Sequence, residues 1–305
     1  MAQAALEIDR ISKRYGDLIA LRELNLRVAA GELVGLVGGN GAGKTSAIRI
    51  SAGVLSADSG TVRYNGRPIS ARDRAGIGYL PAERGLYPQL RLVEQLVYLG
   101  ELFGLDINDA HREAERWLDR FGMRGFRSRR INTLPPADQQ RAQLAIALMP
   151  NPDLLVFDEP FTDLDPLGVD VLSNVLREKA ESGAAVLISS PGFDIAERIC
   201  DRICVLHNGQ SVAVGGVAEL RAGHLDTVVV DAPDAPPGWA DNLPGTRVRA
   251  AAGTRIVLEI DADADDQVIL ATALSTGTVR EFSRQQCSLR ERFGELLGPG
   301  GRRTW

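Results

Sequence analysis

The stretch GELVGLVGGNGAGKTSAIRI, residues 31–50, decides the fold of this chain. An apolar run, ELVGLVG, leads into a glycine-rich turn, and a segment with a helical pattern, SAIRISAGVL, follows it. The turn fits the pattern G-x-x-x-x-G-K-[ST] over residues 38–45 and stands between a strand and a helix, which is the context that this motif needs. We therefore predict a phosphate-binding loop in an α/β domain of the P-loop NTPase class.

The residues of this loop also predict how a nucleotide would be held. Glycines let backbone N–H groups close around phosphates, and the start of the next helix adds a positive end. Lys44 would bridge the β- and γ-phosphates, and Thr45 would hold Mg²⁺. The only other lysines are Lys13 and Lys179, so a lysine here indicates a need for a compact ammonium group. We predict that ATP and Mg²⁺ are the cofactors and that the loop residues in contact with nucleotide are Gly38, Gly39, Asn40, Gly41, Ala42, Gly43, Lys44, Thr45 and Ser46.

A second motif, LLVFDEP at residues 154–160, is a buried strand that ends in two carboxylates. Asp158 is placed to hold Mg²⁺ directly or through water, and Glu159 to orient or deprotonate an attacking water. Taken alone, such a pair is more often a strand-end turn with two solvated acids. The phosphate-binding loop upstream in the same chain favours the catalytic interpretation.

The first 222 residues have the sequence pattern of an α/β domain, in which short β-rich segments alternate with helical stretches or turns. The predicted strands are 6–12, 32–38, 60–66, 76–81, 153–159, 184–190 and 202–209. Between about residues 88 and 150 the strands stop, and LRLVEQLVYLGELFG and DAHREAERWLDRFG carry apolar residues at helical spacing. We predict that a helical subdomain interrupts the sheet there.

The order of predicted strands and helices changes over residues 223–298, which we predict to be a separate α+β accessory domain. TVVVDAP is a strand, PPGWADNL is a short helix or a turn, and TRVRAAAGTRIVLEI is a hairpin. A helix, a strand and a final helix SLRERFGELLG follow, so the order is that of a split βαβ, or ferredoxin-like, unit. Residues 299–305 are expected to be a disordered tail.

Composition narrows the function classes. The 305 residues carry a formal net charge of −5, which argues against nucleic acid as the main ligand. No apolar run approaches the ~18 residues that a membrane span needs, and the N-terminal residues lack the apolar core of a signal peptide. We expect a cytoplasmic protein whose role at a membrane requires a partner that supplies the spans.

Together these motifs resemble the ATPase subunit of an ABC transporter over the first 222 residues. The resemblance implies that Tyr15, in SKRYGDLIAL, stacks on adenine. It also implies that Asp163 and Asp165, in FTDLDP, communicate across an ATPase dimer. The C-terminal domain is similar to that of exporters of the sodium- and antibiotic-efflux branch. The implied partners are an integral membrane permease, docked on residues 88–125, and a second ATPase subunit in a homodimer or a heterodimer.

The chain departs from the family where each ATPase offers an LSGGQ signature to its neighbour's ATP. The matching stretch is LPPADQQR, which replaces Ser, Gly, Gly and Gln by Pro135, Pro136, Ala137 and Asp138. Proline has no N–H but is well tolerated near a helix start, so the helix should survive without its phosphate donors. Asp138 is expected to bring a negative charge to the end that should face a phosphate, where two like charges ~4 Å apart cost about 1 kcal/mol in water.

Two further positions differ from the family pattern. Pro191, in VLISSPGFDIAER, stands where the family has a switch histidine, and losing one preorganised donor typically costs ~10²- to 10³-fold in rate. Ala82, in IGYLPAERGL, stands where the family has a glutamine, although the neighbouring Glu83 could partly serve. These departures predict ATP binding with impaired hydrolysis.

Three functional hypotheses remain open from the sequence. The first is an ATP-binding exporter subunit that couples ATP binding and slow hydrolysis to efflux through a separate permease, either as a homodimer or as the catalytically weak or regulatory partner of a second, intact ATPase. The second is an ordinary transporter ATPase for which Lys44 and Glu159 suffice. The third is a nucleotide sensor without a transport role. The split βαβ appendix favours transport, and the chain would then lie on the inner face of the cell membrane.

Overall fold

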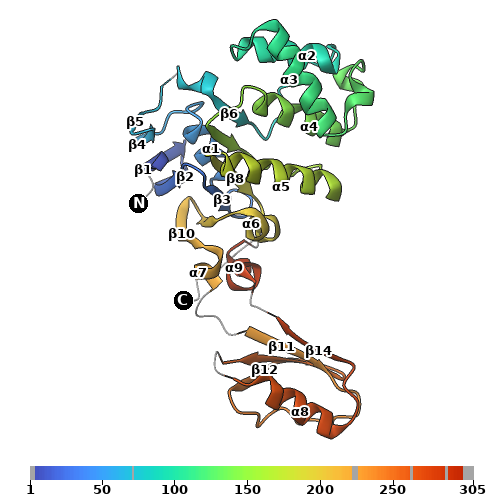
Figure 1. Cartoon of the computed structure of the whole chain (residues 1–305). Coiled ribbons are helices and arrows are strands. Elements are labelled where there is room, and N and C mark those ends of the chain that lie inside the picture. The colour runs from blue at the N-terminus through green and yellow to red at the C-terminus, as the bar shows by residue number, and fades with distance from the viewer. Residues whose placement is uncertain (1–3, 71, 222–225, 262–263, 286–287, 298–305) are drawn as a thin grey trace. The chain divides into compact units, whose positions relative to one another are not determined.

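The computed structural model describes residues 4–70, 72–221, 226–261, 264–285 and 288–297 (Figure 1). The chain forms two compact units, and the second runs from Ala218 to Glu295. The division falls after Val217, whereas the sequence places it after residue 222. The predicted tail, 299–305, lies outside the described residues. No helix in the described ranges is long and apolar enough to cross a membrane.

A six-stranded sheet forms the centre of the first unit, with the strand order β10-β9-β3-β8-β7-β6. Its strands are β3 (Leu33–Val37), β6 (Ile77–Leu80), β7 (Leu154–Phe157), β8 (Ala185–Ser190), β9 (Arg202–His207) and β10 (Gln210–Gly216). All neighbours are parallel except β9 and β10. Strands β3, β7 and β8 are buried at every residue, as expected for a parallel sheet covered on both faces.

Helices cover both faces of this sheet. Helix α1 (Lys44–Ser51) lies on one face, and α5 (Pro166–Glu181) and α6 (Phe193–Ile199) belong to the other. The approach of α6 is close, because a Cβ at Gly35 would lie 2.8 Å from the Sγ atom of Cys200. Glycine in the middle of β3 therefore lets a helix pack directly against the strand that leads into the phosphate loop.

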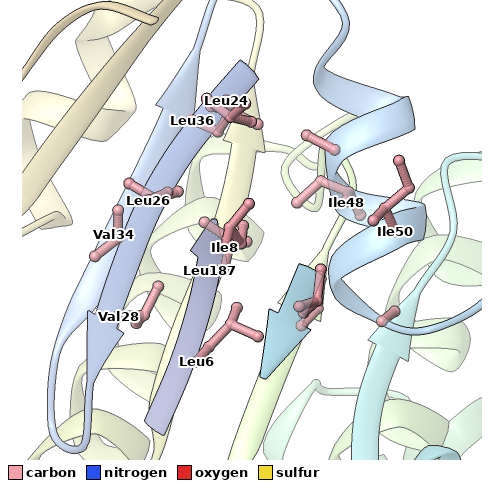
Figure 2. Close-up of a cluster of buried hydrophobic side chains, with 14 of the residues drawn as sticks. Leu6, Ile8, Leu24, Leu26, Val28, Val34, Leu36, Ile48, Ile50 and Leu187 are labelled. Carbon is pink, nitrogen blue, oxygen red and sulfur yellow. The ribbon is translucent and has the colours of Figure 1, made fainter. Parts of the chain in front are cut away.

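A second sheet of the first unit is antiparallel, with the order β2-β1-β4-β5. Its strands are β1 (Ala4–Tyr15), β2 (Leu18–Ala29), β4 (Ser59–Tyr64) and β5 (Arg67–Pro68). The sequence interpretation missed β2 and β10, and also the two-residue β5. Figure 2 shows side chains from β1, β2, β3, β8 and α1 gathered in one apolar cluster, in which Leu6, Leu26, Leu36 and Ile48 are labelled. This shared core fixes α1, and with it the phosphate loop, between the two sheets.

A group of helices interrupts the central sheet between β6 and β7. They are α2 (Leu92–Leu102), α3 (Ile107–Arg120) and α4 (Pro136–Leu148), with short 3₁₀ turns at Arg124–Phe126 and Ile131–Thr133 (Figure 1). The carboxylate of Asp106 caps α3 by accepting from the N–H groups of Asn108 and Asp109. These helices occupy the segment where the sequence predicts a helical subdomain.

The side chain of Trp117, on α3, lies close to α5, one of the helices that pack on the central sheet. Trp117 is 1% exposed and stacks on Phe121, with ring centroids 5.6 Å apart. The ammonium of Lys179, on α5, lies 5.6 Å from the centre of the Trp117 ring. Arg120, also within 6 Å of that ring, is ion-paired with Glu178 of α5. Cation–π contact and ion pair together join α3 to α5.

The second unit is built on the four-stranded sheet β12-β13-β11-β14, in which all neighbours are antiparallel. Its elements are β11 (Asp226–Asp231), β12 (Thr246–Ala252), β13 (Arg255–Ile260), α8 (Asp266–Thr276) and β14 (Glu281–Gln285), with α7 (Val217–Arg221) before and α9 (Leu289–Leu297) after them. In chain order the strands lie 4-1-3-2 in the sheet, which is the arrangement of a split βαβ unit. Residues 236–243 form turns, so α8 is the one crossover helix in the described part of this sheet.

Candidate functional site

The loop between β3 and α1 has the tight form that its glycines predict. A Cβ at Gly38 would lie 2.4 Å from the carbonyl oxygen of Leu206. Gly43 has a φ of +104°, and a Cβ there would lie 2.2 Å from the carbonyl oxygen of Ala20. Any larger residue at either position would displace a neighbouring strand end. The loop is therefore held close to the sheet, with its backbone N–H groups at the start of α1.

Lys44 is 5% exposed, and its ammonium lies among three oxygens. The Nζ atom donates to the carbonyl oxygen of Gly38 at 2.8 Å and to that of Gly39 at 3.2 Å. The third neighbour is the Oε1 atom of Glu159, 3.5 Å away. An ammonium group has three donors, so these three oxygens account for all of them. The structure thus brings together the lysine of the first motif and the glutamate of the second.

Asp158 is 1% exposed at the end of β7. Its Oδ1 atom accepts a hydrogen bond from the hydroxyl of Ser189 at 2.6 Å. Its Oδ2 atom is buried and has no hydrogen-bond partner among the described residues. A buried, unpartnered carboxylate oxygen beside a phosphate loop fits a site for Mg²⁺, which prefers oxygen ligands and keeps several of its waters.

Glu159 follows in a left-handed backbone conformation, with a φ of +48°. Its N–H donates to the hydroxyl oxygen of Ser189 at 2.8 Å. Few non-glycine residues adopt this conformation, and it persists only where the surroundings hold it. The hydrogen bond that this N–H donates to Ser189 is one such constraint, and the Glu159 side chain lies beside Lys44.

Tyr15 lies at the edge of the loop, where its hydroxyl oxygen is 3.4 Å from the hydroxyl oxygen of Ser46. Tyr15 as a whole is 46% exposed, so part of its side chain is open to solvent beside the loop. The ammonium of Lys13 lies 5.8 Å from the ring centre. The structure therefore brings together Tyr15 and Ser46, two residues of the predicted nucleotide site that are far apart in the sequence.

A cleft of about 400 Å³ opens beside Glu159. Its lining consists of Ala82, Glu83, Arg84, Gln140, Glu159, Thr162 and Asp163. Ala82 offers only a methyl group to this space, and Glu83 instead pairs with Arg49 of α1 at 3.1 Å. Arg84 forms an ion pair with Asp163, whose φ is +65°. Ala82 and Glu83 thus line the same cleft as Asp163, one of the two predicted dimer-communication residues.

The first turn of α4 begins with two prolines. Pro135 is the N-cap residue, Pro136 is the first helical residue, and neither has an N–H. The N–H groups of Asp138 and Gln139 both donate to the carbonyl oxygen of Pro135 at 3.0 Å. Of the four substituted positions 135–138, only Ala137 retains an N–H outside those bonds. The helix survives, as the sequence predicts.

The side chain of Asp138, which the sequence expects to bring a negative charge to the helix start, is paired within its own helix. Asp138 is 6% exposed, and its carboxylate accepts from Arg141 at 2.8 Å, one helical turn along. The guanidinium of Arg141 also pairs with Asp165. Asp165 caps α5 by accepting from the N–H of Gly168, and this bond, assisted by Arg141, lowers the pKa of Asp165. The pairing with Arg141 explains why Asp138 turns inward.

Pro191 lines a second cavity together with Glu159, Phe161 and Thr162. The side chain of proline has no hydrogen-bond donor, so it cannot supply what a histidine would. Three contributors to the site were missed from the sequence, namely Ser189, Arg141 and Arg84. A signal existed only for Ser189, because a polar residue at the carboxyl end of a buried parallel strand lies at the edge where such sheets bind ligands.

The chain is similar in sequence to known nucleotide-binding transporter proteins. Residues 21–162 match the ABC transporter family. The chain is 33% identical to the ABC transporter ATP-binding protein YhaQ of Bacillus subtilis (strain 168), over 96% of this chain and 98% of that protein. It is 34% identical to Nod factor export ATP-binding protein I of Paraburkholderia xenovorans (strain LB400), over 77% of this chain and 79% of that protein.

Solved structures are similar as well. An ATP-binding subunit of an ABC transporter superposes with a TM-score of 0.66 at 30% identity, covering 71% of this chain and 92% of that one. A dimeric bacterial ABC transporter cassette superposes with a TM-score of 0.65 at 22% identity, covering 69% of this chain and 98% of that one. These structures share the cassette fold, whereas the alignment with the Bacillus protein is long enough to include the second unit as well.

Proposed function

The chain belongs to the family of ABC transporter ATP-binding proteins, and on that premise we propose that it binds ATP with Mg²⁺ and drives export through a separate membrane permease. The observation that carries this proposal is the cluster of Lys44, Asp158 and Glu159 at the phosphate loop. Lys44 lies 3.5 Å from Glu159, and Asp158 keeps one buried oxygen without a partner among the described residues. Similarity to Nod factor export proteins supports the direction of transport.

Each predicted site residue has a role in this proposal. The loop residues 38–46 bind the phosphates, with Lys44 as the cation, and Tyr15 supplies the aromatic face for adenine. Asp158 and Thr45 hold Mg²⁺, which would neutralise charge on the phosphates. In the nucleotide-bound state a phosphate oxygen would take the place of the Glu159 carboxylate beside Lys44. Glu159 would then be free to orient or deprotonate the attacking water.

We propose that hydrolysis is slow. Pro191 supplies no donor to the cavity that it shares with Glu159, and the start of α4 has lost the hydroxyl and two N–H groups of a signature. The rate of the isolated chain should therefore be well below about 1 s⁻¹, the lower end of common phosphoryl-transfer rates. In a homodimer both composite sites would carry both defects. With an intact partner ATPase, each site would carry one of them.

We propose further that the chain docks on a permease at the inner face of the cell membrane. The docking surface would be the segment 88–125. Its neighbourhood offers apolar surface, since Tyr87 and Tyr98 are each almost half exposed and line a concavity with Pro88 and Leu90. The second unit, residues 218–295, would be an accessory domain of the exporter.

Three measurements test this proposal. Fluorescent ATP should bind in a Mg²⁺-dependent manner, and Lys44→Ala should abolish binding. ATP turnover should be slow and should vanish in Glu159→Gln. A tagged chain isolated from its native cell should co-purify with an integral membrane permease. Absence of ATP binding, or turnover faster than about 1 s⁻¹ that depends on Glu159, would contradict the respective parts.

The co-purifying proteins also distinguish the second candidate function. The degenerate helix start at Pro135 and Pro136 favours a catalytically weak or regulatory partner of an intact ATPase. That arrangement predicts a second ATPase subunit in the isolated complex. A permease with this chain alone would support a homodimer instead.

A further inference from the structure

Ser189 is placed between the two nucleotide-binding motifs. It lies near the end of β8, and its backbone pairs with Leu36 in β3, the strand that leads into the phosphate loop. On its other side, β8 pairs with β7, the strand that leads into Asp158. The side chain is 0% exposed. A buried hydroxyl in this position must find its hydrogen-bond partners within the site.

The partners of Ser189 fix the direction of its hydrogen bonds. A serine hydroxyl has one proton and can also accept. The N–H of Glu159 donates to the Ser189 oxygen at 2.8 Å. The Ser189 proton is therefore free for Asp158, whose Oδ1 atom accepts it at 2.6 Å. The result is a directed chain from the Glu159 backbone through Ser189 to the Asp158 carboxylate.

This chain leaves the two oxygens of Asp158 in different states. Oδ1 is committed to Ser189, whereas Oδ2 is buried and has no partner among the described residues. A carboxylate held at one oxygen cannot rotate freely, so its other oxygen keeps one direction. Glu159 is affected at the same time, because the same hydroxyl binds the N–H of a residue in the left-handed conformation.

We propose that Ser189 is a positioning residue of the Mg²⁺ and ATP site. It holds Asp158 so that Oδ2 would be available to the cation, and it holds the backbone of Glu159 so that the carboxylate lies beside Lys44. This inference rests on the proposed function, because it assumes that the chain binds ATP with Mg²⁺. Residues that orient metal ligands in this way typically contribute ~10- to 100-fold to metal affinity.

The neighbouring Ser190 provides a matched control. It is also buried, at 6% exposure, and lies at the end of the same strand. Its hydroxyl, however, donates to the carbonyl oxygen of Gly192 at 2.8 Å and makes no bond to Asp158 or Glu159 within the described residues. The variants Ser189→Ala and Ser190→Ala therefore remove the same group from the same strand end, and only the first breaks the chain of hydrogen bonds.

The test is a Mg²⁺ titration of fluorescent ATP binding, with a parallel ATP titration in EDTA. For Ser189→Ala we expect the Mg²⁺ concentration at the midpoint to rise about tenfold or more, while ATP affinity in EDTA stays within about twofold. Ser190→Ala should match the wild type. Ser189→Thr keeps the hydroxyl and should restore most of the Mg²⁺ dependence. Ser189→Cys approximately keeps the side-chain volume but has only a weak donor. It should also raise the Mg²⁺ midpoint, and it replaces the alanine variant if that variant does not fold.

The outcomes separate this inference from the proposed function. If the wild type binds ATP in a Mg²⁺-dependent manner and folded Ser189→Ala or Ser189→Cys shows the same midpoint, the positioning role is wrong and the proposed function stands. If the midpoint shifts equally in Ser190→Ala, the effect belongs to the strand end in general and the inference is again wrong. A wild-type chain that binds no ATP overturns the proposed function and this inference together.

Discussion

The carboxylate of Asp138 accepts a hydrogen bond from Arg141 at 2.8 Å, within the first two turns of α4. Asp138 stands at the position where the family carries the last residue of its signature. Arg141 also binds Asp165, which caps α5. The altered helix start is therefore held by contacts within its own chain, and the negative charge of Asp138 is paired with the guanidinium of Arg141.

Removal of Arg141 should destabilise the first unit. Arg141→Met leaves the buried Asp138 carboxylate without a cation, and breaking such a pair typically costs about 3–5 kcal/mol. Because Asp165 is half exposed and Arg141 is not fully buried, we expect about 2–3 kcal/mol in urea denaturation. Adding Asp138→Asn should recover part of the loss. As a control, Arg124→Met, which removes an exposed ion pair with Asp119, should change stability by less than about 1 kcal/mol. Equal effects of the two methionine variants would contradict this interpretation.

Glu159 should compete with nucleotide for Lys44. The two side chains lie 3.5 Å apart, and opposite charges at about this distance attract by about 1 kcal/mol even in water. Glu159→Gln removes that competitor, so we expect ATP to bind about three- to tenfold more tightly while hydrolysis is lost. Glu159→Asp, which keeps the charge, should not tighten binding as much. Equal nucleotide affinities for wild type and Glu159→Gln, measured by calorimetry, would show that the ion pair does not oppose binding.

A donor at position 191 should raise the rate of hydrolysis. Pro191 is exposed and lines the cavity beside Glu159, so a histidine can be accommodated there without displacing the core. One preorganised donor is typically worth ~10²- to 10³-fold in rate, and we expect at least tenfold from Pro191→His because the helix start remains degenerate. Pro191→Ala should give no gain. A histidine variant no faster than the alanine variant, in steady-state phosphate release, would place the rate limit elsewhere.

Stability at low pH should depend on Asp73. Arg67 and then Ser70 hold the pKa of Asp73 at about 2, below its ordinary value of 3.8. A carboxyl group whose pKa is lowered by folding stabilises the protein above the ordinary pKa, and this contribution is lost as the pH falls through the lowered value. Asp73→Asn should therefore be less stable than the wild type at pH 7. The difference should be smaller at pH 3, as urea denaturation at the two pH values would reveal. An undiminished difference at pH 3 would mean that ionisation of Asp73 is not its source.

The sequence predicted the parts of the site that follow a local pattern. The phosphate loop, the strand that ends in Asp158 and the helix after Pro135 each depend on residues close together in the chain. Asp138 shows where this reasoning stops, because its direction is set by Arg141, whose guanidinium is in turn held by Asp165. Ser189 carried a positional signal at the end of a buried strand, but its two partners, Asp158 and Glu159, belong to a different strand end. Such contacts depend on the packing of distant segments, which spacing in the sequence does not record.

The contact between Trp117 and Lys179 gives the molecule an optical reporter. The indole belongs to α3, and its stacked cation belongs to α5 beside the central sheet. Indole emission responds to the charges around the ring, so a displacement of one helix against the other would change its intensity and wavelength. The other tryptophans of the chain are Trp239 and Trp305, and both can be replaced by phenylalanine. Movement of α3 against α5 within the first unit could then be timed on addition of nucleotide without attaching a dye.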